Sequence, residues 1–193
     1  MARKFKRGQA VMYFEGETGK RCYFGGKMGA YRVLSSIPNV ESGWAIPLSA
    51  VDRAVFPAPS EDRTFDRAVC EAIQYRVDRT FYVQLEYVQA GPHAWAVGYS
   101  LRIGDTRKVL PVAADRTFPT FEEAITAGLS PLLHELTRLA AGVGNAFVDV
   151  GSITATVRRH AKDTIYHLLS TLPAHVQDDI VMSLLGESGD QDG

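Results

Sequence analysis

The stretch Phe81-Tyr-Val-Gln-Leu-Glu-Tyr-Val88 places apolar side chains at every second position. This is the pattern of a half-buried β-strand. The stretch from Ala94 to Ile103 alternates in the same way, and the turn Gly91-Pro-His93 separates the two. A third strand is predicted at residues 108–112, at a sheet edge, because Pro111 cannot donate a ladder hydrogen bond.

Helical patterns flank these strands. A first helix is predicted from five apolar side chains that recur at the spacing of one helical face: Phe65, Ala68, Val69, Ala72 and Ile73. A second helix is predicted over residues 121–141, with Thr120 as its N-cap and acidic residues in its first turn, where the helix dipole favours anions. Residues 61–142 are therefore expected to form an α-β-β-β-α domain.

A C-terminal helical hairpin is predicted over residues 151–186. Ser152 is expected to cap a long helix whose apolar stripe begins at Ile153, and Pro173 to start a shorter helix that ends at Gly186. These helices either pack on the preceding domain or form a homodimer through their apolar stripes. The sequence leaves both alternatives open.

Residues 1–56 are expected to form a small β barrel. Short apolar stretches recur at regular spacing between glycine turns, of which Gly16-Glu-Thr-Gly19 and Gly25-Gly-Lys-Met-Gly29 are the clearest. The stretch Pro57-Ala-Pro-Ser-Glu-Asp62 is the best candidate for a linker. The chain is thus predicted to be an α+β protein with a β barrel first, then the α-β-β-β-α domain and the hairpin.

Two stretches of the first domain resemble a known family. Phe5-Lys-Arg-Gly8-Gln-Ala-Val11, followed by Gly25-Gly-Lys-Met-Gly29-Ala-Tyr-Arg-Val33, is similar to the SH3-like barrels of the KOW type. These have a glycine before the first strand and a glycine turn before a later valine. The resemblance covers about 50 residues and implies binding of RNA, DNA or protein without catalysis.

The second domain resembles double-stranded RNA-binding domains in its predicted order of elements and in the stretch from Gly91 to Gly104. It departs from that family where the second helix opens, since Glu122 and Glu123 stand in place of a lysine cluster. Two acids there repel phosphates, so RNA binding is not expected of this domain. An acidic surface of this kind favours contact with a protein.

Charge is divided unevenly along the chain. Residues 1–32 hold eight basic and two acidic residues, a net charge of +6, which leaves −7 for the remainder of a chain whose total is −1. A basic first domain favours a polyanion as partner. Basic residues on a small barrel also serve solubility, so a merely solvated surface stays open as the alternative.

Motifs for catalysis or metal binding are missing from the sequence. The five histidines have no zinc-ligand spacing, no Gly-x-Ser-x-Gly nucleophile turn occurs, and Gly25-Gly-Lys-Met-Gly29 lacks the Walker A spacing. Cys22 and Cys70 are expected to be free thiols. The N-terminus has no apolar run of a secretory signal and no 18-residue apolar run occurs, so a cytoplasmic protein without a membrane partner is expected. We therefore expect no enzyme, no cofactor and no metal.

The predicted function is that of a nucleic-acid-associated accessory or regulatory protein that binds DNA or RNA through the basic barrel. Cations would neutralise phosphates, and exposed aromatic rings would stack on unpaired bases. The alternative is a phage- or plasmid-type adaptor or inhibitor that binds a protein and no nucleic acid. The residues predicted to contact nucleic acid are Arg3, Lys4, Lys6, Arg7, Lys20, Arg21, Tyr23, Lys27, Tyr31, Arg32 and Trp44.

Overall fold

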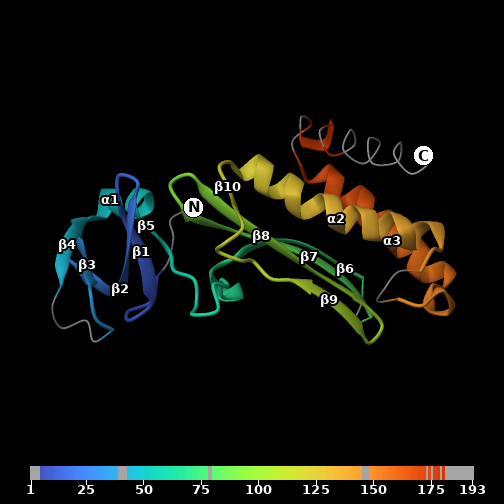
Figure 1. The fold of residues 1–193 in the computed structure, drawn as a ribbon, viewed down its shortest axis with the longest axis horizontal. Helices are drawn as coiled ribbons and strands as arrows, with labels where there is room; N and C mark the ends of the chain where they lie inside the picture. The colour runs from blue at the N-terminus through green and yellow to red at the C-terminus, as the bar shows by residue number, and fades with distance from the viewer. Residues whose placement is uncertain are drawn as a thin grey trace.

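Two antiparallel sheets, joined by a short segment, make up the computed structural model of the chain, and helices cover one face of the second sheet (Figure 1). The structure describes residues 5–38, 43–77, 80–144, 148–172, 174, 176–178 and 180. The combination of strands and helices confirms the predicted α+β class. Among the described residues, no helix has the length and apolar character needed to cross a bilayer.

The N-terminal unit consists of the first sheet, which has five strands, and one short helix. Its elements are β1 (Ala10–Glu15), β2 (Thr18–Met28), β3 (Tyr31–Ser35), β4 (Trp44–Pro47), α1 (Leu48–Ala54) and β5 (Val55–Pro57). The strand order is β4-β3-β2-β1-β5, so the last strand returns to pair with the first. Buried side chains from every strand and from α1 fill its core: Val11, Cys22, Phe24, Leu34, Ile46, Val51 and Val55. The family resemblance of this region stays a prediction.

The turn expected at residues 25–29 lies further along the chain. Strand β2 continues through Gly25 and Gly26 with a register shift after Phe24, and the turn to β3 falls at Gly29 and Ala30. Gly26 and Gly29 have φ values of 107° and 59°. Such positive values are readily adopted only by glycine, so the glycines serve a bulge and a turn rather than one long loop.

The second sheet is formed by five strands. These are β6 (Glu71–Arg76), β7 (Phe81–Gly91), β8 (Ala94–Ile103), β9 (Thr106–Leu110) and β10 (Thr117–Phe118). The strand order is β10-β8-β7-β6. Strand β9 pairs with the same edge of β8 as β10 does, but with the second half of that strand. Strand β9 thus lies at the edge, as predicted for this segment, and it ends before Pro111.

The helix predicted from Phe65 to Ile73 is wrong. A 3-10 turn, η1 (Arg67–Val69), is followed by β6, which pairs with β7 along its whole length. Ile73 and Tyr75 pack against the main core at every second position, while Phe65 is buried in a separate small cluster on the other side of the sheet. These residues therefore serve two different cores, which a single helical face cannot do. The order of elements that resembled a double-stranded RNA-binding domain is lost with this helix.

Helix α2 (Phe121–Ala141) has the predicted bounds and the predicted cap. The backbone N–H of Glu123 donates to Oγ1 of Thr120 at 3.2 Å, and Gly142 ends the helix with a φ of 79°. Gly128 faces the sheet so closely that a Cβ there would lie 2.5 Å from Cγ2 of Val97. The missing side chain is thus what allows α2 to approach β8.

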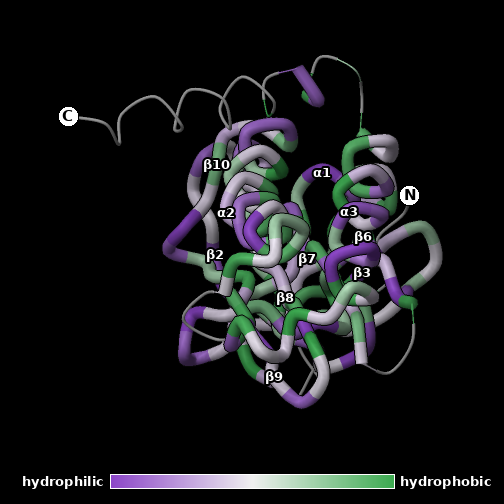
Figure 2. Tube along the Cα trace, turned by 90° about the vertical axis from the view of Figure 1, so that its right-hand side faces the viewer, coloured by the Kyte–Doolittle hydropathy of each residue, from purple (hydrophilic) through white to green (hydrophobic). Residues whose placement is uncertain are grey.

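Helix α3 (Ala155–Ser170) begins two residues later than expected. Residues Val150–Ser152 form a 3-10 turn, η2, and Thr154 rather than Ser152 caps α3, because its Oγ1 accepts from the N–H of Val157 at 3.2 Å. Helices α2 and α3 lie side by side above the sheet (Figure 2).

The apolar stripe of the C-terminal region is buried in the same core as α2 and the sheet. Its buried members are Ile153, Ala161, Leu168, Leu172, Val176 and Ile180. The described residues between 174 and 180 are helical, whereas Pro173 and residues 181–186 of the predicted hairpin lie outside the described residues. The packing alternative is therefore observed for the described part, and dimerisation through residues 151–186 stays a prediction.

The two sheets touch at one end of β7. Strands β5 and β1 of the first sheet contact β7. Within the first sheet, the rings of Phe14 on β1 and Phe56 on β5 meet edge to face, with centroids 5.4 Å apart. A Cβ on Gly91, the last residue of β7, would lie 3.1 Å from the ring of Phe14. Arg21 Nη1 donates to the carbonyl oxygen of Pro59 at 2.8 Å, which ties the linker to β2. The linker thus runs beside a packed contact between the units.

Candidate functional site

A groove of about 480 Å³ opens on the first sheet. It is lined by Tyr13 and Glu15 from β1, Thr18 and Lys20 from β2, and Trp44 from β4. Strands β1 and β2 pair with each other, whereas β4 is separated from β2 by β3 in the strand order, so the groove depends on the way the sheet bends round. It is a concave surface built entirely from the N-terminal unit.

The strand register explains why these side chains meet. Tyr13 lies directly opposite Lys20 in the β1–β2 pair, so both point to the same side. The rings of Tyr13 and Trp44 meet edge to face, with centroids 6.1 Å apart. The Nζ atom of Lys20 lies 5.2 Å from the centroid of the Trp44 ring, within the range of a cation–π interaction.

This arrangement combines apolar ring surface with a positive charge. A flat base or a peptide ring can stack on such a surface, and a phosphate can pair with the ammonium group of Lys20. Glu15 adds a carboxylate to the groove lining, which opposes a phosphate in its vicinity. The groove lining therefore contains both a negative charge, from Glu15, and a positive charge, from Lys20.

The predicted cations do not form a single patch. Lys20 and Arg21 are consecutive in β2 and therefore point to opposite sides of the strand. Lys27 lies opposite Arg32, and the guanidinium of Arg32 lies 5.4 Å from the centroid of the Phe24 ring. Lys6, with Arg7, is exposed in the segment before β1.

The described cations of this unit differ from those of the second unit in their ion pairs. Within the described part of the chain, no ion pair joins a carboxylate to any of the six predicted cations from Lys6 to Arg32. The ion pairs Arg67–Glu86 and Lys108–Glu135 both lie in the second unit. The two remaining predicted cations, Arg3 and Lys4, lie outside the described residues.

The predicted aromatic residues are also divided. Tyr31 is 46% exposed at the end of the β2–β3 hairpin. Tyr23 is half-buried and shares the face of Arg21, away from Lys20. Of the predicted residues, Lys20 and Trp44 are the two that line the groove. Tyr13 was not predicted as a binding residue, because the alternating pattern of a strand does not indicate which of its side chains lies at the rim of a bent sheet.

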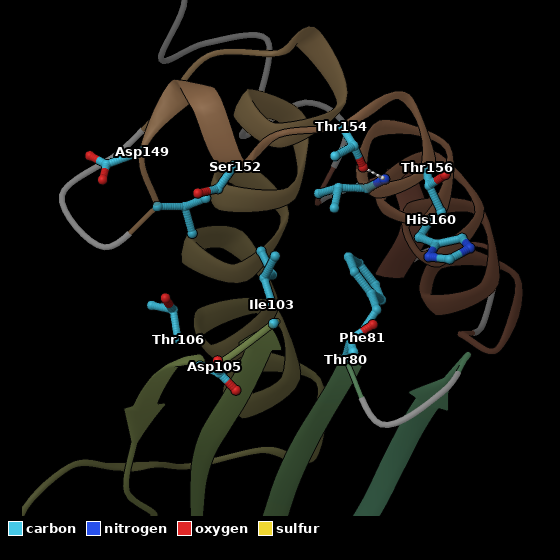
Figure 3. A pocket seen from close by; sticks show the side chains of 13 residues that line it. Thr80, Phe81, Ile103, Asp105, Thr106, Asp149, Ser152, Thr154, Thr156 and His160 are labelled. Carbon is cyan, nitrogen blue, oxygen red and sulfur yellow. Dashed lines mark hydrogen bonds between the residues drawn. The ribbon is translucent and has the colours of Figure 1, made fainter.

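A second cavity, of about 560 Å³, lies where the β8–β9 turn meets the start of α3 (Figure 3). It contains His160 together with Asp105 and Asp149. Figure 3 shows His160 and Asp149 on opposite sides of the cavity and Asp105 on the turn below it. The His160 ring packs edge to face on Phe81, with centroids 5.4 Å apart. These groups do not converge as an acid–base pair, and the described residues contain no cluster of metal-binding side chains.

Both cysteines are free thiols with raised pKa values, as expected for thiols in an apolar environment. Burial raises the pKa of Cys22 above its ordinary value. Burial, with the carboxylates of Glu86 and Asp66, raises the pKa of Cys70 to about 12 although Arg67 opposes the shift. A nucleophilic cysteine needs a lowered pKa, so neither thiol is suited to catalysis.

Comparison with protein-family models found no match, and comparisons with curated proteins and with solved structures found none. The functional argument therefore rests on the geometry of these surfaces.

Proposed function

We propose that the protein is a non-enzymatic, nucleic-acid-associated accessory or regulatory protein that binds a nucleic acid strand through its N-terminal unit. The observation that carries this proposal is the groove in which Lys20 lies over the Trp44 ring beside Tyr13. An unpaired base stacks on the exposed ring surface, and Lys20 contacts the adjoining phosphate. The other cations of this unit raise the local potential and steer the polyanion toward the groove.

The acidic remainder of the chain has a different role in this proposal. It contacts a protein partner or a second copy of the chain through residues 151–186. The protein acts in the cytoplasm, where DNA and RNA are both accessible.

The test is fluorescence anisotropy with a fluorescein-labelled single strand of 20 thymidines and with a duplex of the same length, at several salt concentrations. Trp44→Ala should weaken binding of the single strand by roughly 5- to 100-fold, which corresponds to about 1–3 kcal/mol for one stacked base. Lys20→Ala should reduce the salt dependence by about one released ion. Absence of binding at the lowest salt concentration overturns the proposal.

The matched controls come from α3. Tyr166 is 78% exposed and Lys162 is exposed, so Tyr166→Ala and Lys162→Ala remove an aromatic ring and a cation outside the groove. Both should bind as tightly as the unaltered protein. Because Trp44 also packs against the core of the first sheet, Lys20→Glu at the exposed rim provides a second variant that leaves this core intact.

A protein partner is the second candidate function, and Glu15 is the observation that favours it. A carboxylate in an aromatic groove suits a basic side chain of a bound peptide better than a phosphate. In that case the chain acts as a phage- or plasmid-type adaptor or inhibitor. A pull-down that yields one stoichiometric protein, unchanged by nuclease and lost in Glu15→Lys, would support this function.

A further inference from the structure

The second sheet carries a row of arginines that the linear sequence does not show. Arg76 lies opposite Tyr82 in the β6–β7 pair, and Tyr82 lies opposite Arg102 in the β7–β8 pair. Arg102 in turn lies opposite Arg107 in the β8–β9 pair. Residues directly opposite one another in antiparallel strands point to the same side of the sheet. Four strands thus place three arginines and one tyrosine on one face, in one line.

This face is the one that the helices leave open. Phe81 and Val83, on either side of Tyr82, are buried in the core below α2, and so are Leu101 and Ile103 on either side of Arg102. Because side chains alternate along a strand, Tyr82 and Arg102 point away from that core. Figure 1 shows α2 and α3 on one face of the sheet. All three arginines of the row are exposed, and Tyr82 is half-buried between them.

Polar side chains lie beside the arginine row, and the nearby carboxylate of Glu86 is paired. Gln74, Gln84 and Ser100 lie opposite one another beside the arginine row. One step further along β7, Glu86 is paired with Arg67 at 3.0 Å and accepts from Nε2 of Gln84 at 2.9 Å. Arg67 therefore neutralises Glu86, so this carboxylate does not offset the charge of Arg102 and Arg107.

The arginines also act on Tyr82 electrostatically. Burial and Glu86 raise the pKa of Tyr82, while Arg67, Arg107 and Arg76 act in the opposite direction. The Nε atom of Arg102 donates to the carbonyl oxygen of Gly104 at 3.0 Å, which steadies its position at the hairpin. Asp105, in the same turn, offsets part of the charge at that end of the row.

We propose that this arginine row, Arg76-Tyr82-Arg102-Arg107, is a second binding surface for single-stranded nucleic acid, separate from the groove at Trp44. Adjacent strands lie about 4.8 Å apart, so the row spans about 14 Å, enough for several phosphates. Guanidinium groups bind phosphate oxygens with two parallel hydrogen bonds, and Tyr82 offers a ring face on which a base stacks. An acidic peptide matches the charge but has no base to stack on Tyr82, so the combination of groups favours a nucleic acid strand.

The inference is independent of the groove, and the test separates the two. The double variant Arg102→Ala with Arg107→Ala should bind a fluorescein-labelled 20-thymidine strand about 10-fold or more weakly and lose about two units of salt dependence, one for each phosphate contact. The matched control is Arg158→Ala with Arg159→Ala, two exposed neighbouring arginines on α3. This control should bind as the unaltered protein does. If the double variant weakens binding and Trp44→Ala does not, the arginine row stands and the groove proposal fails.

Substitutions at Tyr82 give a readout that charge alone cannot produce. Tyr82→Phe keeps the ring and should bind within about 2-fold of the unaltered protein, whereas Tyr82→Ala should bind several-fold more weakly. Equal binding by Arg102→Ala/Arg107→Ala and by its control overturns the proposal. The proposal is also overturned if polyglutamate competes as effectively as the unlabelled strand, because the surface would then bind any acidic polymer.

Discussion

The Nε atom of Arg67 lies 3.0 Å from Oε1 of Glu86, whose side chain is 3% exposed. Arg67 also donates through Nη2 to Oγ of Ser100 at 3.3 Å, so it links η1 to two strands of the second sheet. A carboxylate removed from water in this way needs its partner, because an unpaired buried charge is costly. The contact fixes the segment before β6 on the face opposite the helices.

Removal of Arg67 should therefore destabilise the protein. Arg67→Ala is expected to lower the free energy of unfolding by about 2–3 kcal/mol, somewhat less than for a fully buried pair because Arg67 itself is half exposed. Urea denaturation measures the change. Arg53→Ala, at an exposed position of α1, is the control and should stay within about 0.5 kcal/mol. A similarly small loss for Arg67→Ala would contradict the importance of the pair.

Gly128 should not tolerate a methyl group. Gly128→Ala improves helix propensity by about 1 kcal/mol, yet its Cβ would lie 2.5 Å from Cγ2 of Val97 and 3.0 Å from Cδ1 of Leu85. Overpacking of this kind costs about 1–3 kcal/mol, so the net effect should be a loss of stability and a lower melting temperature. Gly151→Ala, where nothing lies within 4 Å of the new Cβ, should be close to neutral. A stabilised Gly128→Ala variant would show that α2 moves away from β8 at little cost.

The thiols should react slowly in the folded protein. Reagents such as dithionitrobenzoate attack the thiolate, and with a pKa of about 12 only about one Cys70 thiol in ten thousand is ionised at pH 8. Since a raised pKa keeps the neutral form dominant below that value, the rate should climb steadily as the pH rises from 7 to 10. Unfolding in guanidinium should release both thiols rapidly. If one equivalent of thiol reacts rapidly in the native protein, and still does so in the Cys22→Ser variant, this expectation is contradicted.

The contact between the two units should limit access to the linker. Phe14→Ala removes the ring that lies against Phe56 and Gly91, and it should cost about 1–2 kcal/mol because Phe14 is half-buried. Limited proteolysis should then cut residues 58–64 faster than in the unaltered protein. Tyr166→Ala, which removes an exposed ring on α3, should leave the cleavage rate unchanged. Equal cleavage of both variants would indicate that the units are held by other contacts.

Local patterns were sufficient to predict much of the second unit. The strand from Ala94 to Ile103 and the helix over residues 121–141 follow from short-range periodicity and from the cap at Thr120, and both have the predicted bounds. The segment from Phe65 to Ile73 failed because its apolar residues contact two cores on opposite sides of a sheet. Such an arrangement depends on pairing with β7, which no local pattern encodes.

The candidate surfaces were less predictable than the elements. Lys20 and Trp44 were predicted as binding residues and lie together, but Arg21, although adjacent to Lys20, points to the other side of β2. The arginine row was missed because its members come from four strands and become a line only once the register is known. The overall negative charge of residues 33–193 concealed it further.

The packing of Phe14 and Phe56 against the end of β7 also has a consequence for the length of a bound strand. Gly91 lies at the end of β7 that touches the first unit, and Tyr82 lies nine positions away near its start. At about 3.3 Å per residue, this distance is about 30 Å, or roughly nine stacked nucleotides at 3.4 Å each. The groove at Trp44 belongs to the first unit, so this length covers only the part of the path that runs along β7. If both proposed surfaces bind one strand, short oligonucleotides would occupy one surface at a time, and affinity would rise once a strand reaches both.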